Sequence, residues 1–479
     1  MFNLREYQEE GIRLAYSQFN LGKQRVIFWL ATGGGKSRCF TSVTNDMVVL
    51  NIPVVIVVRR RDLIEQASKN LDAFKIKHGV YMSNHRRYRP HEMVQVCSID
   101  TLDARSVYPH SDKAPFLIID EMQDCTPRGK KYTRFLDAYP NSRCLGFSAT
   151  PFSDNSLFDA IIKPIEAHEL MEKGNLVPVK MFTPEGQIDT SDVKIKRNGL
   201  FDEKELFQAS SGQEIIGDFV RDWRLYSQER PTVLFAVNVE HSKMIAEAFN
   251  EAGIRACHAD ANTPREEREK ALKGLANGKI QVLCNVNIFS TGVDVPEIAC
   301  IQVCRPTQSL IWYIQALGRG LRPSLETGKT NCIIIDNAGN TFRFGNPYRV
   351  HTAKLGKAER HDPDEEDLTI RQCKLCHFIF DVGEKICPEC GHTNPPVERK
   401  IKTAEGELIE YDMTPEEREM MDRGLIVADC HKLKHVANRT EKIKKKKNWT
   451  LYRLKDKYGS DKMEQYSNII LEALSDMED

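Results

Sequence analysis

The sequence has no excess of charge of either sign and no long hydrophobic run. Its 68 Lys and Arg residues are matched by 68 Asp and Glu residues, so the formal net charge is zero. The protein as a whole therefore does not attract an anionic polymer, and binding one would need a local cluster of positive charge. No apolar segment approaches the roughly 20 residues that cross a bilayer. The first residues also lack the basic-then-apolar layout of a secretory signal. We therefore expect a cytoplasmic protein with no membrane partner.

Internal repeats at solenoid spacing are missing as well. Ten of the 14 cysteines stand singly among apolar neighbours, and thiols such as Cys144, Cys284 and Cys332 are expected to be buried and free. At 479 residues the chain exceeds what one ordinary hydrophobic core organises, so two or three folded units are expected. Apolar and charged fractions of 41% and 28% are typical of a soluble globular protein.

Short β-branched and aliphatic runs alternate with helical stretches in two sets. The runs lie at 26–30, 54–58, 116–119, 233–237, 281–284 and 332–335. This alternation predicts parallel sheets that are covered by helices on both faces. We expect an α/β fold with two parallel-sheet domains in tandem, followed by a small cysteine-containing unit and a partly helical C-terminal tail.

Changes in composition suggest where these parts begin and end. Between the two sets of runs lies a polar stretch with Gly, Pro and no clear period, and a strongly acidic run at 362–367 precedes the cysteine unit. The expected parts are a first domain at 1–170, a linker at 171–214, a second domain at 215–345, an acidic linker at 346–371, the cysteine unit at 372–393 and a basic, helical tail at 394–479.

A glycine-rich segment follows the first predicted strand. Leu30-Ala31-Thr32-Gly33-Gly34-Gly35-Lys36-Ser37 opens a predicted helix, where glycine backbone N–H groups can wrap phosphates. Lys36 would bind the β and γ phosphates of ATP, and the Ser37 hydroxyl would bind Mg²⁺. Leu30 stands where the general phosphate-loop pattern has its first Gly, but the narrower Ala-Thr-Gly-x-Gly-Lys-Ser form is intact. A chance glycine-rich turn is the alternative.

An acidic pair, Asp120 and Glu121, ends the apolar run at 116–119. Asp120 would hold Mg²⁺ through water, and Glu121 would orient and polarise the attacking water. An Asp-Glu turn after a strand is common. This pair, however, is expected at the mouth of the same sheet as Lys36, where ligands of open α/β folds bind.

Residues 311–322 of the second domain, Ile-Trp-Tyr-Ile-Gln-Ala-Leu-Gly-Arg-Gly-Leu-Arg, predict a helix. Gln315, Arg319 and Arg322 are spaced by four and three, so they would share one face. Gly318 and Gly320 each cost about 1 kcal/mol relative to Ala in a helix, which indicates close approach of another surface. Arginines that complete a phosphate site in the first domain would couple hydrolysis to domain closure. An exposed basic helix end is the alternative.

These three elements, in this order, make the chain similar to the superfamily 2 helicases of the DExH type, which have two RecA-like motor domains. The stretch 285–340 resembles in particular the bacterial RadD (YejH) group and its phage-encoded relatives, which carry a zinc site after the second motor domain. The resemblance covers roughly the first 390 residues. It implies a nucleic-acid-dependent ATPase in the cytoplasm of a bacterium or of a phage-infected cell.

The resemblance also assigns roles to single residues. Leu4-Arg5-Glu6-Tyr7-Gln8 is similar to the adenine-recognising motif, which would place Arg5 and Gln8 at the nucleotide, with Gln8 as the reader. Ser148-Ala149-Thr150-Pro151 matches the motif that links the ATP site to the nucleic-acid groove. Ser290-Thr291-Gly292-Val293-Asp294-Val295-Pro296 fits motif V, which would place Gly292 and Asp294 at the nucleotide.

One position departs from the family pattern. Gln123 stands where RadD-like and many DExH proteins have a His that contacts the Gln of motif VI, the motif that segment 311–322 with Gln315 resembles. The Gln123 amide can still donate and accept toward Gln315. We expect hydrolysis to survive this change, and the coupling of hydrolysis to strand movement is the property that Gln123 would affect.

Family members bind one strand by its phosphates across both domains, and Arg59, Thr101 and Thr291 are the matching positions. Such binding should weaken steeply with salt. The segment 85–89, His-Arg-Arg-Tyr-Arg, either grips a backbone and stacks a base or forms a solvated loop. The lysine-rich run at 442–447 is followed by aromatic residues, which favours a DNA-binding tail over a merely soluble one.

The remaining cysteines, Cys373, Cys376, Cys387 and Cys390, form two Cys-x-x-Cys pairs with zinc-ribbon spacing. A segment of about 20 residues cannot bury a core, whereas structural Zn²⁺ supplies roughly 10–16 kcal/mol of apparent binding energy. Four thiolates leave no open position on the ion, so the zinc would be structural. Disulfides or a redox pair are the alternatives. The surface of this unit could contact DNA or a protein partner.

We therefore expect an ATP-dependent DNA helicase or translocase that acts in replication, recombination or repair. Its cofactors would be ATP, Mg²⁺ and Zn²⁺, and its partner would be single-stranded or branched DNA. One alternative is a DNA-dependent ATPase that remodels branched DNA or displaces protein without separating strands, and another is an RNA helicase. A nucleic-acid-binding scaffold with an inactive ATP site is disfavoured, because Lys36, Glu121, Arg319 and Arg322 are all present.

Overall fold

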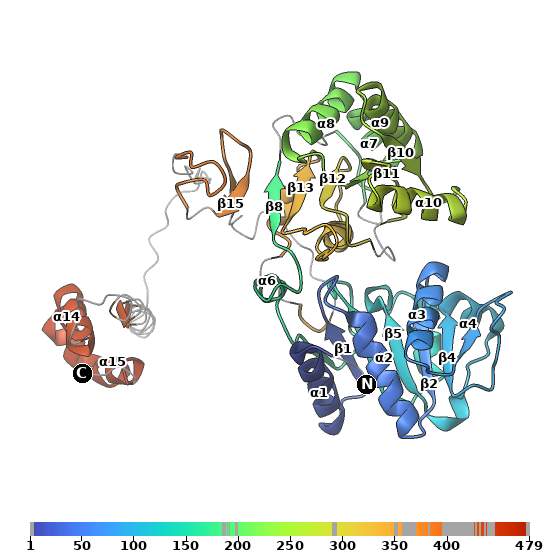
Figure 1. Ribbon diagram of the computed structural model, residues 1–479. Helices are drawn as coiled ribbons and strands as arrows, with labels where there is room; N and C mark the ends of the chain where they lie inside the picture. Colours follow the sequence, from blue (N-terminus) through green and yellow to red (C-terminus); the bar gives the residue numbers. More distant parts are fainter. Residues whose placement is uncertain are drawn as a thin grey trace. The chain divides into compact units, whose positions relative to one another are not determined.

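The computed structural model forms two compact units, Met1–Val397 and Glu398–Asp479, which are taken in turn (Figure 1). The first contains two α/β domains and the cysteine unit, and the second is helical. No helix within the described part of the chain is long and apolar enough to span a bilayer. The described residues are 4–183, 188, 190, 192–196, 200–289, 295–348, 353–356, 370–381, 384–394, 426, 429, 430, 433, 434, 437 and 446–475.

The first α/β domain is built on a parallel sheet with strand order β3-β4-β2-β5-β6-β1-β7. Its strands are β1 Arg25–Trp29, β2 Val54–Val58, β3 Gly79–Tyr81, β4 Val94–Ser98, β5 Phe116–Asp120, β6 Cys144–Ser148 and β7 Ala160–Ile162. Alternate residues of each strand enter different apolar clusters. Ile56 packs with the helices of one face and Val57 with those of the other. Since both faces are buried, the central strands are apolar along their whole length.

Helices cover both faces of this sheet (Figure 1). Buried side chains of α1, α2 and α3 join the cluster on one face, and those of α4 and α5 join the cluster on the other. The bounds are α1 Glu6–Asn20, α2 Lys36–Val49, α3 Arg61–Ala73, α4 Ile99–Arg105, α5 Lys130–Asp137 and, after β7, α6 Ala167–Glu172, with short 3-10 turns at Ser111–Lys113 and Met122–Asp124.

The second α/β domain repeats this design with strand order β10-β11-β9-β12-β13-β8. Its strands are β8 Val179–Phe182, β9 Thr232–Phe235, β10 Ala256–Ala259, β11 Val282–Asn285, β12 Cys300–Val303 and β13 Cys332–Asp336. Its helices are α7 Glu203–Ser210, α8 Gln213–Tyr226, α9 Val239–Glu251, α10 Arg265–Ala276, α11 Leu310–Leu317 and α12 Asn340–Phe344, with a 3-10 turn at Gly318–Gly320. The two parallel-sheet domains and the buried free thiols Cys144, Cys284 and Cys332 confirm the prediction.

The segment 171–214, expected to be a linker, also contributes to the second sheet. Strand β8 lies within it and pairs in parallel with β13, from Val179 opposite Cys332 to Ile335 opposite Phe182. Helix α7 lies within it too. Only the second half of β8 is buried, because it is an edge strand, so its sequence lacks the continuous apolar run that marks a central strand.

The cysteine unit is an antiparallel pair, β14 Ile370–Gln372 and β15 Ile379–Asp381, that docks on β8. The Phe378 ring lies 5.6 Å from the Phe182 ring, and the Thr183 N–H donates to the His377 carbonyl over 3.3 Å. The Lys180 ammonium lies 2.7 Å from the Glu389 carboxylate. The unit therefore covers the edge strand of the second sheet, which would otherwise expose unpaired backbone groups.

The C-terminal unit contains α14 Lys446–Gln465, interrupted at Gly459, and α15 Ser467–Ala473. Its helices bury a small apolar cluster that includes Leu454, Tyr466 and Ile470. The helical character expected of this part is confirmed, and the described residues there pack around a core of their own. Residues 442–445 of the lysine-rich run lie outside the described part of the chain.

Candidate ATP site and nucleic-acid contacts

The loop between β1 and α2 has the backbone geometry of a phosphate-binding loop. Gly33 and Gly35 have φ values of 84° and 90°, which residues with a Cβ rarely adopt. A Cβ on Gly35 would lie 2.3 Å from Gln8 Nε2. Helix α2 begins directly afterwards, and the first N–H groups of any helix lack partners within it, so they are available to an anion.

The segment before α1 braces this loop. The Tyr7 hydroxyl and the Gln8 amide both donate to the Gly34 carbonyl, over 2.9 and 3.0 Å. The Arg5 guanidinium donates to the Tyr7 oxygen over 3.0 Å, and the Arg5 N–H donates to Gln8 Oε1 over 2.9 Å. The sequence analysis named Arg5 and Gln8 as nucleotide contacts but did not identify Tyr7 as a residue that braces the loop. Its position next to Gln8 in the same short motif was the signal that could have indicated this role.

The acidic pair stands at the carboxyl end of β5. Burial raises the pKa of Asp120 to about 7, the neighbouring Glu121 charge adds to the shift, and Lys36 opposes it. Burial also lowers the pKa of Lys36, against the opposing charges of Glu121 and Asp120. Partly buried carboxylates next to a hydroxyl-bearing phosphate loop fit a hard cation such as Mg²⁺, whose charge would favour the ionised carboxylates.

A cavity of about 500 Å³ collects the predicted catalytic groups of both domains. The first domain contributes the phosphate loop and the acidic pair, and the second contributes the end of its motif VI segment. Among the lining residues are Arg5, Gln8, Thr32, Gly33, Gly35, Lys36, Ser37, Asp120, Glu121, Arg319 and Arg322. The two arginines therefore face the same cavity as Lys36, as an ATP site completed by the second domain requires.

The motif VI segment differs from the single helix that the sequence predicts. Helix α11 ends at Leu317, and Gly318–Gly320 forms a 3-10 turn. A Cβ on Gly318 would lie 2.7 Å from Thr32 Cβ of the phosphate loop, and one on Gly320 would lie 2.3 Å from Cys332 Sγ. The turn is tight because it fits between the first domain and β13. The inference that these glycines permit a close approach is therefore supported by geometry.

Replacing Gly318 by Ala is expected to lower ATP turnover about 5- to 100-fold. The added methyl group must displace Thr32 before the domains meet, and overpacking of this kind costs about 1–3 kcal/mol. Steady-state ATP hydrolysis measures the effect. Gly212→Ala is the matched control, because a Cβ there meets Ile215 at an ordinary 3.7 Å. Equal turnover in the two variants would contradict the close approach.

A chain of side-chain hydrogen bonds runs from motif VI through the acidic pair. The amides of Gln315 and Gln123 both donate to Glu121 Oε2, over 3.2 and 2.6 Å. The Ser148 hydroxyl donates to Gln123 Oε1 over 2.6 Å and accepts from the Thr150 N–H over 2.9 Å. Sequence reasoning expected Gln123 to work toward Gln315. In the structure the two amides share one carboxylate oxygen, so Glu121 links them.

A buried carboxylate at the end of β13 anchors the helix that precedes the arginines. Asp336 accepts from the Thr341 hydroxyl over 2.7 Å, from the Asn340 amide over 3.2 Å and from the Tyr313 hydroxyl over 3.3 Å. Tyr313 lies on α11, so this network fixes α11 to the sheet. Sequence reasoning did not single out this aspartate, although an acidic residue directly after a buried strand was the available signal.

Two of the predicted nucleic-acid contacts, Arg59 and Thr101, lie at the same edge of the first domain's sheet. Strands β2 and β4 are parallel neighbours with Val58 opposite Ser98, so Arg59 and the start of α4 share the carboxyl edge of the sheet. Arg59 is mostly exposed and lies 3.1 Å from Asp124. Thr101 is only 7% exposed and its N–H donates to the capping Ser98 hydroxyl. The predictions for Thr291, Gly292 and Asp294 fall outside the described residues.

The four cysteines of the small unit converge as their spacing predicts. Their sulfur atoms all lie within 4.8 Å of one another, with Cys373 3.7 Å from Cys390 and Cys376 3.7 Å from Cys387. The Leu375 N–H points at the Cys373 sulfur over 3.4 Å, as expected for a donor to a thiolate. Gly391 takes the positive φ that its turn demands. This donor set is compatible with one tetrahedral zinc ion.

Comparison with known families gives two matches along the motor region. The family described as the res subunit of type III restriction enzymes matches residues 1–153, and the helicase conserved C-terminal domain family matches residues 214–324. These ranges contain the phosphate loop and acidic pair in the first case and Gln315, Arg319 and Arg322 in the second.

Individual proteins are similar over the same region. A 51.5 kDa protein of a Lactococcus phage is 31% identical over 392 residues, which cover 79% of this chain and 81% of that one. A candidate ATP-dependent helicase of Saccharomyces cerevisiae, IRC3, is 30% identical over 70% of this chain, which spans about half (51%) of its length. A fragment of a candidate HsdR subunit of a type I restriction enzyme from Vibrio vulnificus has the same fold, with a TM-score of 0.57, 16% identity and coverage of 72% of this chain and 66% of that one.

Proposed function

Since this chain belongs to superfamily 2 of the helicases and is a nucleic-acid-dependent ATPase, we propose that it is an ATP-driven DNA helicase or translocase. In this proposal ATP hydrolysis between the two α/β domains moves the protein along one DNA strand, in replication, recombination or repair. The observation that carries it is the shared cavity, in which Arg319 and Arg322 of the second domain face Lys36 and Glu121 of the first.

The side chains around this cavity divide the chemistry among them. Helicases of this kind use ATP, usually with Mg²⁺. Lys36 and the glycine loop would hold its phosphates, and Ser37 and Asp120 would hold the cation. Glu121 would orient the attacking water, and its hydrogen bond to Gln315 over 3.2 Å would make that orientation depend on domain closure. Arg319 and Arg322 would neutralise charge that develops on the phosphates.

Movement along DNA would follow from the same contacts. The hydrogen-bonded series Gln315, Glu121, Gln123 and Ser148 connects motif VI with the motif at 148–151. Opening and closing of the cavity would therefore shift the two domains relative to a strand that Arg59, Thr101 and Thr291 bind by its phosphates. DNA is favoured over RNA because the family that matches residues 1–153 is described as a subunit of type III restriction enzymes, which act on DNA.

Single-stranded DNA is expected to raise the ATP turnover of the protein at least about 10-fold, and the gain should fall steeply between 50 and 200 mM salt. Steady-state ATP hydrolysis with and without a 30-nucleotide strand measures this, and Lys36→Ala controls for contaminating ATPases. Turnover that ignores DNA at every salt concentration would remove the motor proposal. The same assay with RNA ranks the two nucleic acids.

A second function within the same class is remodelling of branched DNA, or displacement of bound protein, without strand separation. The presence of Gln123 in place of the family's His supports this second function. Gln123 links the ATP site to Ser148, so the change falls on the connection between hydrolysis and strand movement. Forked substrates with one labelled strand separate the two functions. ATP-dependent release of the strand supports a helicase, whereas DNA-stimulated hydrolysis without release supports a remodeller.

A further inference from the structure

The basic and aromatic segment 85–89 lies between β3 and β4, and its backbone is held by the domain. The Val80 N–H donates to the Arg87 carbonyl over 2.9 Å. The Gln95 amide donates to the carbonyls of Arg89 and Glu92, over 2.7 and 2.8 Å. Because these hydrogen bonds hold the middle and the end of the segment, its exposed side chains are presented from a fixed backbone.

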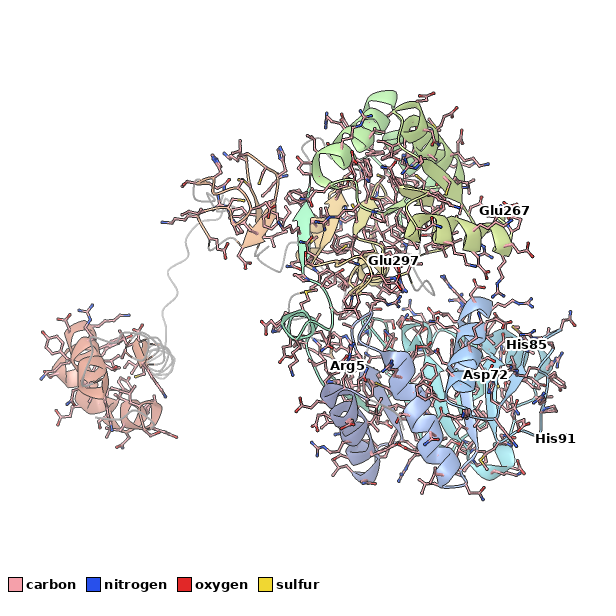
Figure 2. The ribbon with its side chains drawn as sticks, in the orientation of Figure 1. Arg5, Asp72, His85, His91, Glu267 and Glu297 are labelled. Atoms are coloured by element: carbon pink, nitrogen blue, oxygen red, sulfur yellow. The ribbon has the colours of Figure 1, made fainter. Side chains whose placement is uncertain are left out.

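Two cationic residues of the segment serve this anchoring. One Arg87 nitrogen lies 2.7 Å from the Asp72 carboxylate and 3.1 Å from the Ser68 hydroxyl. The His85 ring nitrogen lies 3.2 Å from the Glu65 carboxylate. Asp72 and His85, labelled in Figure 2, lie on the same side of the first domain. These side chains bind the loop to α3 and are not available to a partner.

The other members of the segment are exposed, and one of them, Tyr88, lies beside a further arginine. Arg86, Tyr88 and Arg89 are exposed, and the Arg105 guanidinium lies 5.9 Å from the centre of the Tyr88 ring. The Tyr88 ring also lies 5.6 Å from the buried Tyr81 ring. The Arg89 side chain is 65% exposed, and its 4.0 Å approach to Glu92 is an exposed pair that contributes little. We call Arg86, Tyr88, Arg89 and Arg105 the Tyr88 patch.

Helices α4 and α3 connect the Tyr88 patch with the two predicted nucleic-acid contacts of the first domain, Thr101 and Arg59. Arg105 is the last residue of α4, one helical turn after Thr101. The anchor Glu65 lies in the second turn of α3, which begins two residues after Arg59. A nucleic-acid strand bound at the carboxyl edge of β2 and β4 that continues along α4 would therefore meet Arg105 and the patch.

We propose that the Tyr88 patch is a single-strand binding surface that extends the nucleic-acid path beyond Thr101, with one unpaired base stacked on Tyr88 and neighbouring phosphates bound by Arg86, Arg89 and Arg105. The inference rests on the proposed function. An aromatic ring set among cations and nearly half exposed matches the chemistry of single strands, whose bases offer free faces and whose phosphates carry charge. A base inside a duplex has no free face, so the patch selects unpaired strands.

Fluorescence anisotropy with labelled oligo(dT) of 20 nucleotides tests this on the full chain. Tyr88→Ala is expected to weaken binding roughly 5- to 150-fold, and Tyr88→Phe is expected to retain it, because stacking requires only the ring. Arg105→Gln is expected to reduce the slope of log affinity against log salt by about 0.7, the value for one lost phosphate contact on a single strand. Arg13→Gln, an exposed arginine on α1, is the matched control.

The outcomes distinguish this inference from the proposed function. Suppose that the wild-type protein binds oligo(dT) and its turnover responds to DNA, but Tyr88→Ala and Arg105→Gln bind as the wild type does. Strand binding by the Tyr88 patch is then refuted, while the proposed motor function is retained. Equal losses on a blunt duplex and on oligo(dT) would refute stacking of an unpaired base. Failure of the wild type to bind any strand would overturn both. Should Tyr88→Ala fold poorly, the exposed pair Arg86→Gln with Arg89→Gln provides the salt-slope test alone.

Discussion

Replacing Arg319 by Ala is expected to lower DNA-stimulated ATP turnover by about 10³-fold or more, with nucleotide binding much less affected. In GTPases a single arginine finger contributes about 10³ to 10⁵ in turnover, or roughly 4–7 kcal/mol of the barrier. Arg319 is almost fully buried, its Nε lies 3.3 Å from the Gln315 carbonyl, and it lines the cavity of Lys36. Its charge is therefore in a position to act only when the second domain meets the first.

The size of the effect depends on geometry as well as charge, which makes Arg319→Lys informative. A lysine keeps the positive charge but loses the planar fork that binds phosphate oxygens in pairs, so only part of the turnover should return. Arg224→Ala on α8, where the guanidinium donates to the Ala252 carbonyl, is the control within the same domain. Steady-state hydrolysis and the affinity for a fluorescent ATP analogue are the measurements. Turnover within threefold of wild type in Arg319→Ala would remove the closure mechanism.

The parts of the fold that could be predicted are those in which a few consecutive residues favour a single local structure. The runs that became β1, β2 and β5 are apolar on both faces because parallel sheets are covered twice. The glycine loop could be placed because left-handed φ values at Gly33 and Gly35 are available to few other residues. Each of these signals lies within a few consecutive residues, so one sequence suffices to detect it.

The parts that could not be predicted depend on contacts between distant residues. Strand β7 has only three residues and only half of β8 is buried, so neither has an apolar run long enough to be recognised as a strand. The break of the motif VI helix at Gly318 follows from its distance to Thr32, almost 300 positions earlier. Periodicity within 311–322 is the same for a straight helix and for a helix that ends in a 3-10 turn.

In the ATP site, too, some features could be predicted from the sequence and others could not. Lys36, Asp120, Glu121 and the two arginines could be named from motifs, but which of them touch could not. Glu121 accepts hydrogen bonds from Gln123 of its own domain and from Gln315 of the other, and this sharing depends on how the two sheets meet. The sequence of segment 85–89 likewise could not show which side chains face the domain, because the Glu65 and Asp72 carboxylates that pair with His85 and Arg87 come from helix α3.

Removing the metal of the cysteine unit is expected to unfold that unit and to expose the edge of the second sheet. Purified protein should contain one zinc per chain, and Cys387→Ser should contain none, because three thiolates and a hydroxyl do not reproduce the tetrahedral site. Apparent zinc binding energies of roughly 10–16 kcal/mol exceed what so small a unit can gain from its own apolar contacts. Metal content by mass spectrometry and limited proteolysis between residues 370 and 394 are the measurements.

The position of the unit extends this effect beyond its own residues. Its Phe378 ring packs on Phe182, and Glu389 pairs with Lys180, so both of these β8 contacts are lost when the unit unfolds. We therefore expect Cys387→Ser to lower the thermal midpoint of the second domain by several degrees, since each lost kcal/mol shifts a domain of this size by roughly 2–8 °C. Cys257→Ser, at a free and partly exposed thiol, should keep the zinc and the midpoint. A wild-type protein without zinc, or a Cys387→Ser variant that retains it, would refute the metal assignment, whereas an unchanged midpoint in a zinc-free variant would refute only the structural link to β8.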